Sequence, residues 1–283
     1  MAFVIQSRFP KVMRRVRRTG DAVDSVGKHA LFYAQSLASV PKAFVHYRTE
    51  TIRLIAEISM GTGALAVIGG TVVIVGFLTL AAGGTIAVQG YSSLGNIGVE
   101  ALTGFFAAFI NVRIAAPVIS GIGLAATIGA GATAQLGAMR VAEEIDALEV
   151  MAIRPVPFLV GTRVLAGMIA IIPLYSLAVI ASFIASRFAT VVIYGQSAGV
   201  YDHYFETFLI PSDILWSFGQ AIVMAITVMM IHTYYGYHAA GGPVGVGIAV
   251  GNAVRASLVA VVTVTLLISL AIYGTSGNFH LSG

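Results

Sequence analysis

The sequence has no cysteine among its 283 residues, which excludes disulfide bonds and thiolate metal sites without identifying a cellular compartment. It also lacks the Gly-x4-Gly-Lys-Ser/Thr pattern of a phosphate-binding loop, so this chain is not expected to hold ATP in such a loop. Charged residues are scarce, at 10% of the chain against about 25% in a typical soluble domain. These absences argue against a soluble enzyme and against a chain that hydrolyses ATP by itself.

Long apolar runs are present instead. Hydrophobic residues account for 58% of the chain, and several segments long enough to cross a bilayer carry no charged side chain. Because about 20 apolar residues in a helix span a bilayer core, we predict an all-α polytopic membrane protein with five transmembrane helices. Residues 1–57 are expected to precede a single membrane domain, residues 58–283. The predicted spans lie near residues 64–82, 103–131, 160–184, 215–236 and 256–273.

The distribution of basic residues predicts the orientation in the membrane. Ten of the sixteen Lys and Arg residues lie between Arg8 and Arg53, and Arg140 and Arg154 lie between the second and third spans. Since cytoplasmic loops are enriched in Lys and Arg, we predict a cytoplasmic N-terminus, a C-terminus on the outer (periplasmic) side and a location in the plasma membrane. Nucleic acid is not an expected partner, because the excess base is juxtamembrane and no aromatic platform accompanies it.

The basic region before the first span mixes apolar and cationic residues. Residues 21–57 resemble two short amphipathic helices lying in the cytoplasmic interface and broken at Pro41. Their charge would suit anionic lipid. A soluble basic tail is the alternative.

The second span contains an intramembrane charge, Arg113. A buried arginine costs at least a few kcal/mol at mid-membrane, so its side chain should face protein, water or headgroups. Either it has a functional role, or it reaches an interface or pairs with Glu100. Further along, Ala125, Gly129, Thr133 and Gly137 recur every four residues, and an alanine stripe lies beside them. This small-residue pattern predicts a close helix-packing surface.

An acidic segment separates the second and third spans. Glu143, Glu144, Asp146 and Glu149 are four of the twelve acidic residues of the whole chain. We predict a helix over residues 138–153, with Glu143, Asp146 and Glu149 on one side and an apolar stripe of Val141, Ile145, Leu148 and Ala152 on another. A membrane-surface helix would carry Lys and Arg instead, so the segment is expected to dock on another protein. A solvated acidic loop is the alternative; catalysis is not expected, because no partner base or nucleophile lies nearby.

The run from Thr133 to Pro155, TAQLGAMRVAEEIDALEVMAIRP, followed by Arg163 and Ala166-Gly167, resembles the signature of MlaE/YrbE-type permeases. These are the membrane subunits of Mce-associated ABC lipid transporters. The similarity extends to Val88–Tyr91, Ala116–Val118 and Tyr235–Tyr237. It implies interfacial N-terminal helices, an MlaE-like permease domain with five spans, and a cytoplasmic coupling helix between the second and third.

Two departures from the family pattern favour a subtype. Arg113-Ile114-Ala115 stands where members commonly have Arg-Glu-Leu, and Ala125-Ala126-Thr127 where they have Gly-Arg. The chain is therefore similar to the B-type permease of actinobacterial, mycobacterial-like operons. This resemblance implies a heterodimer with an A-type permease, a cytoplasmic ABC ATPase dimer that binds ATP and Mg, and Mce substrate-binding proteins outside. The ending Gly277–Gly283 favours sterol over fatty acid as the imported lipid.

The resemblance implies the following site residues. The ATPase-coupling residues would be Met139, Arg140, Val141, Glu143, Glu144, Ile145, Asp146, Leu148 and Glu149. A lipid path would include Val73, Phe77, Leu80, Gln89 and Tyr91. No catalytic or metal residue is expected, and Asp202, His203 and Glu206 are interpreted as a solvated outer turn. Two other functions stay open: a self-powered secondary transporter, and a non-transporting scaffold of an envelope lipid-transfer complex.

Overall fold

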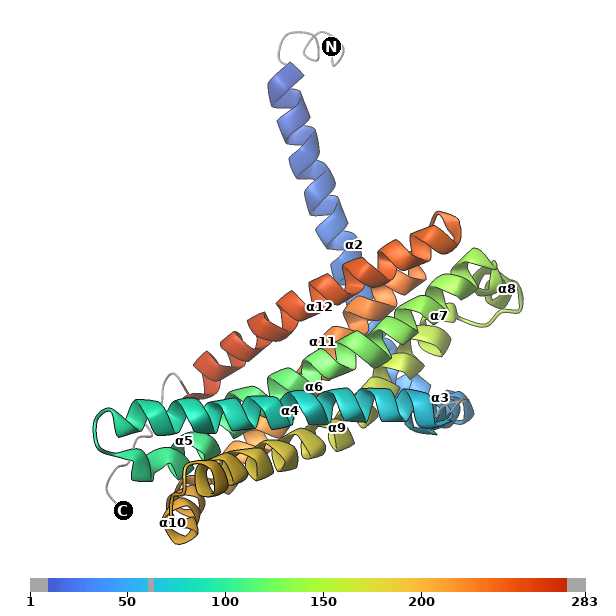
Figure 1. Cartoon of the computed structure of the whole chain (residues 1–283). Helices are drawn as coiled ribbons and strands as arrows, with labels where there is room; N and C mark the ends of the chain where they lie inside the picture. The colour runs from blue at the N-terminus through green and yellow to red at the C-terminus, as the bar shows by residue number, and fades with distance from the viewer. Residues whose placement is uncertain (1–9, 61–63, 274–283) are drawn as a thin grey trace.

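The computed structural model describes the backbone of residues 10–60 and 64–273, and within them the side chains of residues 27–56 and 70–272 (Figure 1). Every regular element in this described part of the chain is helical. The elements are α2 (Pro10–His46), α3 (Arg48–Met60), α4 (Ala64–Gly95), η1 (Glu100–Leu102), α5 (Thr103–Ile110), η2 (Asn111–Ala115), α6 (Ala116–Leu124), η3 (Ala125–Gly129), α7 (Ala130–Val141), α8 (Glu144–Val150), η4 (Val156–Gly161), α9 (Thr162–Phe188), η5 (Ala189–Ile193), α10 (Ala198–Phe208), α11 (Pro211–Tyr237) and α12 (Gly242–Tyr273).

Five of the described helical rods are long and apolar enough to cross a membrane, which confirms the predicted all-α class and the predicted number of spans. They cover Gly70–Gly95, Glu100–Val141, Val156–Ile193, Pro211–Tyr237 and Gly242–Ile272. The first rod continues well beyond residue 82, where the prediction ended it. Its last turns contain small polar side chains that a helix accommodates by bonding to itself, as when Thr85 Oγ1 donates to the carbonyl of Ala81 at 2.8 Å.

The second rod is continuous but not uniform. Two π-helical turns, η2 and η3, interrupt it on either side of α6. Pro117 lies at the start of α6, directly after η2. Proline has no backbone N–H and its ring crowds the preceding turn, so the wider π turn accommodates it within an unbroken rod.

The rods pack through small residues. α4 lies along α9, α11 lies against α9 and α12, and α7 contacts both α11 and α12. A Cβ added at Gly236 would lie 2.9 Å from the carbonyl oxygen of Thr133, so α7 and α11 approach closely only because this position is glycine. The stripe of Ala125, Gly129, Thr133 and Gly137 is buried where η3 and α7 pack against α11 and α12, which confirms it as a packing surface.

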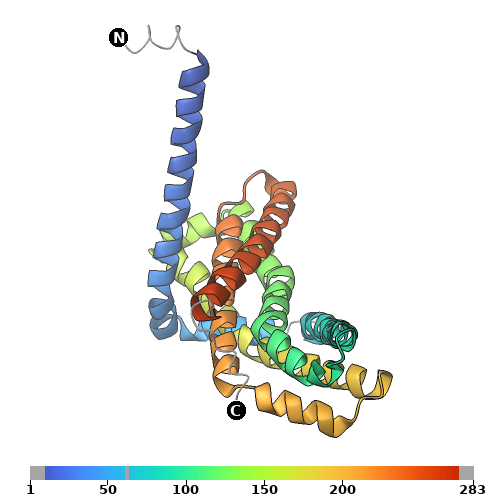
Figure 2. The ribbon, with the colours of Figure 1, turned by 90° about the vertical axis from the view of Figure 1, so that its left-hand side faces the viewer.

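The N-terminal region differs from the prediction. α2 is a single helix that runs through Pro41 and projects beyond the rods, and the chain interrupts its helix only at Tyr47 (Figure 2). The prediction of a break at Pro41 was wrong. Pro41 and Leu37, whose carbonyl loses its partner, lie on the exposed side of α2, where the unpaired carbonyl can reach solvent or headgroups. The opposite side, Phe32, Ser36, Ser39 and Ala43, is buried at helical spacing.

The connections between rods lie at two ends of the bundle (Figure 1). What we call the α8 end carries α8, the start of η4, the last turn of α11 and the start of α12. The α10 end carries α10, η1, the last turn of α4 and the first turn of α11. The acidic segment therefore lies at one end of the bundle, and the Arg113 region lies toward the other.

Candidate functional site: the elbow between the second and third rods

The chain between α7 and η4 forms a sharp elbow, residues 142–155. Its two bends are at Glu143 and Ala152, which have φ of 59° and 60°. α8 between them is one short helix, and it ends in a Schellman motif: the N–H of Ile153 donates to the carbonyl of Leu148, and that of Ala152 to the carbonyl of Glu149, both at 3.0 Å. The prediction of one helix over residues 138–153 was therefore wrong, because the chain leaves helical geometry at both bends.

The elbow is anchored by Ile145. This side chain is fully buried and packs with Leu136 of α7 and Leu159 of η4, and Tyr237 at the end of α11 packs on the same cluster. The predicted apolar docking stripe was wrong: Ile145 faces the chain's own helices, whereas Val141 and Ala152 are exposed. One buried residue thus joins the elbow to three of the five rods.

The outward surface of the elbow is acidic and apolar. Glu143, Glu144 and Glu149 are exposed and have no ion-pair partner in the described part of the chain. Beside them, the side chains of Val150 and Met151 are 88% and 61% exposed. Such exposed apolar residues beside unpaired charges are typical of a protein-docking surface.

Asp146 differs from the other three carboxylates. Its Oδ1 accepts a hydrogen bond from Nη1 of Arg140 at 2.7 Å, across the first bend. The guanidinium of Arg140 also lies 5.9 Å from the ring centre of Tyr237. Both charged side chains are partly exposed, so the pair contributes about 1 kcal/mol or less to stability. Its main effect is to orient α8.

Arg163 connects the third rod to the second near the elbow. It is 6% exposed, and its Nη1 donates to the carbonyl of Leu159 at 3.0 Å, while Nη2 lies 3.4 Å from Oε1 of Gln135. The sequence identifies Arg163 only as part of the family resemblance, and not as a buried side chain. No sequence signal identifies Gln135 on α7 as its partner.

A buried histidine ties together the helices behind the elbow. Nδ1 of His232 on α11 lies 2.7 Å from Oγ1 of Thr133 on α7, and Nε2 lies 3.2 Å from Oγ of Ser257 on α12. Because all three side chains are fully buried, these bonds satisfy polar groups that would otherwise be costly inside the rods. Helix α7, which leads into the elbow, is therefore linked to α11 directly and to α12 through His232.

Arg113 is paired within the chain. Its Nη2 and Nε donate to Oδ2 of Asp213 at 2.6 and 3.0 Å, and its guanidinium lies 4.1 Å from the ring centre of Phe109. The pairing with Glu100 considered above is not the one observed. Asp213 is in the first turn of α11, so the ion pair joins the second and fourth rods toward the α10 end. This ion pair between two rods is a sufficient structural reason for a charged residue at position 113.

A second ion pair lies at the α10 end itself. Nε and Nη2 of Arg187 donate to Oδ1 and Oδ2 of Asp202, each at 2.8 Å. These hydrogen bonds hold the pKa of the Asp202 carboxyl below its usual range. In the same helix, burial raises the pKa of Tyr201 above its ordinary value. The ion pair gives Asp202 a structural role. Among the described residues, no group of three His, Cys, Asp or Glu side chains is placed to hold a metal ion.

The residues suggested for a lipid path fall into two groups. Val73, Phe77 and Leu80 share one face of α4 and are 64%, 70% and 45% exposed. Gln89 and Tyr91 lie in the last turns of the same helix, not beyond it: Gln89 bonds to Ser93, and Tyr91 stacks on Tyr194 with ring centres 4.4 Å apart. The structure therefore brings only the first three together, and their contact with lipid stays a prediction.

Comparisons with known proteins agree with this architecture. The family model described as Permease MlaE matches residues 60–271. A probable ABC transporter permease protein of Rickettsia felis is 28% identical over 260 residues, covering 88% of this chain and 94% of its own length. The chloroplast protein TRIGALACTOSYLDIACYLGLYCEROL 1 of Arabidopsis thaliana is 27% identical over 182 residues, covering 64% of this chain and 52% of its own. Since the family model covers most of the chain, five rods and elbow included, the chain belongs to the MlaE permease family.

Proposed function

We propose that this chain is the membrane-spanning subunit of an ATP-driven lipid transporter and that its elbow receives motion from a separate ATPase. Relatives named as ABC transporter permeases support a partnering ATPase, and the name of the Arabidopsis relative refers to a galactolipid. The observation that carries the proposal is the elbow itself. It exposes carboxylates and apolar side chains outward, while Ile145 fixes it to three rods.

The geometry supports a two-sided mechanism. On the outer side, Glu143, Glu144 and Glu149 would meet basic residues of the ATPase, and Val150 and Met151 would fill an apolar pocket on it. On the inner side, a displacement of α8 would act through Ile145 on α7, η4 and α11. ATP and Mg would be bound by the partner, and this chain would do no bond chemistry.

The finer identity follows the sequence resemblance. We propose a B-type Mce-associated permease in the plasma membrane, with the α8 end in the cytoplasm, paired with an A-type permease and with Mce proteins outside. The imported lipid would be a sterol or a fatty acid. The strings Tyr201–Phe205 and Gly241–Gly247 also resemble the B-type permease. The cations Arg140, Arg154 and Lys42 near the α8 end support the orientation.

Reversing the charge of the elbow tests the central proposal. The tagged chain is purified with the ATPase that accompanies it, and the variant Glu143→Lys/Glu144→Lys is compared with the wild type. Loss of two charge-assisted contacts is expected to weaken ATPase retention roughly tenfold or more and to remove lipid-stimulated ATP hydrolysis.

The matched control is Glu206→Lys in α10, which reverses an acid at the other end of the bundle and should leave both properties unchanged. Unchanged ATPase retention and lipid uptake in the elbow variant would exclude this docking surface. Uptake that collapses with a proton uncoupler while ATP is intact would instead indicate a secondary transporter. Uptake that survives deletion of the chain would favour a scaffold.

A further inference from the structure

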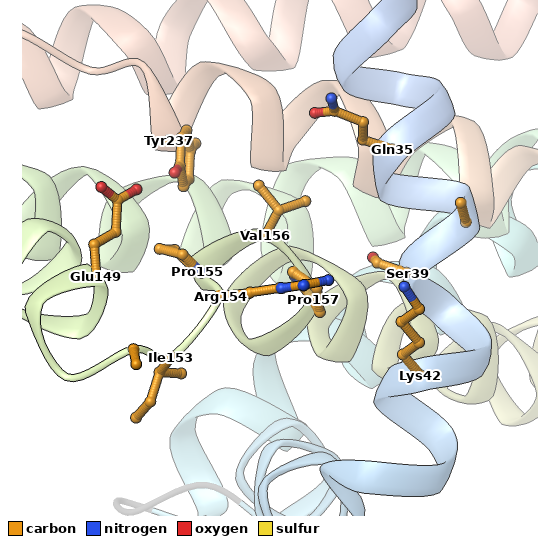
Figure 3. Close-up of a pocket in the computed structure, with 12 residues that line it drawn as sticks. Gln35, Ser39, Lys42, Glu149, Ile153, Arg154, Pro155, Val156, Pro157 and Tyr237 are labelled. Carbon is orange, nitrogen blue, oxygen red and sulfur yellow. The ribbon is translucent and has the colours of Figure 1, made fainter.

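A pocket of about 600 Å³ lies beside the elbow, between it and α2 (Figure 3). One wall is a face of α2 that includes Ser39 and Lys42. The opposite wall is the segment from Ala152 to Pro157, where the elbow enters η4. Tyr237 closes the side toward α11. The pocket thus exists only because the N-terminal helix docks against the membrane domain.

Two cations from separate elements meet in this pocket. Figure 3 shows the guanidinium of Arg154 extended across the pocket toward Lys42 and Ser39. Neither cation has an ion-pair or side-chain hydrogen-bond partner within the described residues. The one acid in the lining, Glu149, lies on the other side and is directed toward Tyr237. Two unpaired cations so placed repel each other, and an anion between them would be stabilised by both.

The pocket lies where the membrane-spanning helices end. Tyr237 is the last residue of the fourth span and Val156 is the first residue of the third, so the pocket is at the depth where lipid headgroups lie. Its lining includes Ala38 and two prolines, and apolar surface continues from it along α2. Leu31 and Val45, each seven residues from Ala38 and hence on the same face, are 61% and 54% exposed. Acyl chains could lie along this face while a headgroup enters the pocket.

We propose that this pocket binds the anionic headgroup of a membrane phospholipid, with Arg154 and Lys42 contacting its phosphate. Arginine presents two parallel donors to phosphate oxygens, and lysine adds a compact charge from the other wall. A bound headgroup joins α2 to the elbow. Lipid binding therefore stabilises the position of the elbow, which is the segment that moves in the proposed mechanism. The binding site itself does not depend on transport.

The test uses the full chain in detergent, delipidated and titrated with dioctanoyl phosphatidylglycerol, with binding followed by native mass spectrometry. Dioctanoyl phosphatidylcholine and inorganic phosphate are titrated in parallel. We expect one saturable site for phosphatidylglycerol and at least about tenfold weaker binding of both other probes. The variant Lys42→Gln/Arg154→Gln should weaken phosphatidylglycerol binding by about tenfold or more.

Arg48→Gln is the matched control, because Arg48 is an exposed cation near the same helix, outside the pocket and without a partner within the described residues. It should bind phosphatidylglycerol like the wild type, and an unchanged unfolding temperature should show that all variants fold. Equal binding of the two lipids, or unchanged binding in the double variant, would overturn the proposal. Inorganic phosphate binding as tightly as the lipid would assign the site to a free anion instead. If the double variant loses ATPase retention but binds phosphatidylglycerol normally, the pocket would be assigned to a protein partner.

Discussion

Replacing Ile145 by alanine tests whether one buried side chain holds the elbow to the rods. The substitution removes three carbon atoms from a fully buried site, which corresponds to about 2.4 kcal/mol at about 0.8 kcal/mol per buried carbon. The cavity left beside Leu136 and Leu159 adds to this loss, and measured values for such changes are about 2–5 kcal/mol. The elbow packs mainly through this residue, so the loss should appear as local opening and not as global unfolding.

Hydrogen–deuterium exchange followed by mass spectrometry measures this opening. A loss of about 2.4 kcal/mol should accelerate exchange of the α8 amides about fifty-fold, while peptides of α9 keep their rates. Ile145→Val should accelerate it only several-fold, since about 1 kcal/mol is lost. Val150→Ala, at an 88% exposed position, should have almost no effect.

Two results would refute the reasoning. Unchanged exchange of the elbow in Ile145→Ala would mean that other contacts hold it. Equal acceleration in α9 would mean that the residue stabilises the whole membrane domain. In the complex with its ATPase, the same variant should retain the partner but lose the coupling of lipid binding to ATP hydrolysis, which separates transmission from docking.

Three other substitutions have defined outcomes. Arg113→Gln, which leaves Asp213 unpaired, should cost up to about 3 kcal/mol by thermal unfolding in detergent, and adding Asp213→Asn should recover part of it. The lowered pKa of Asp202 means that its ion pair stabilises the fold at neutral pH and is lost as the pH falls below about 4; Asp202→Asn should reduce that acid sensitivity in pH-dependent unfolding scans. Gly129→Ala should lower the unfolding temperature, because its Cβ would lie 2.6 Å from a buried imidazole, whereas Gly131→Ala meets open space and should raise it slightly.

The class of fold could be predicted because it depends on composition. Charge-free runs of sufficient length have one stable arrangement in a bilayer, so the five rods followed directly from the sequence. Their ends could not be placed as well. Residues 83–95 contain no charge, and their glycines, threonine and serines are compatible with either a loop or a helix inside a packed bundle. Contact with α9 decides for the helix, and that contact is not visible in the local sequence.

The site was predictable to a similar extent. The exposure of Glu143, Glu144 and Glu149 follows from charge alone, because unpaired carboxylates are not buried. The partner of Arg113 did not follow, since Asp213 is 100 residues away along the chain. The pocket beside α2 depends on where a whole helix docks. Such tertiary pairings leave no periodic signal in either partner.

The two bends of the elbow explain why its helix was predicted too long. Glycine or asparagine in the sequence usually indicates left-handed backbone geometry. Here Glu143 and Ala152 adopt it, at a conformational cost of about 1–2 kcal/mol each. Burying Ile145 contributes about 1.5–3 kcal/mol, which is of the same size as the cost of the bends. Burial of Ile145 thus offsets much of the backbone cost of the two bends. A partner that binds Val150 and the carboxylates can displace the elbow. Because Ile145 moves with it, the displacement reaches α7, η4 and α11 together.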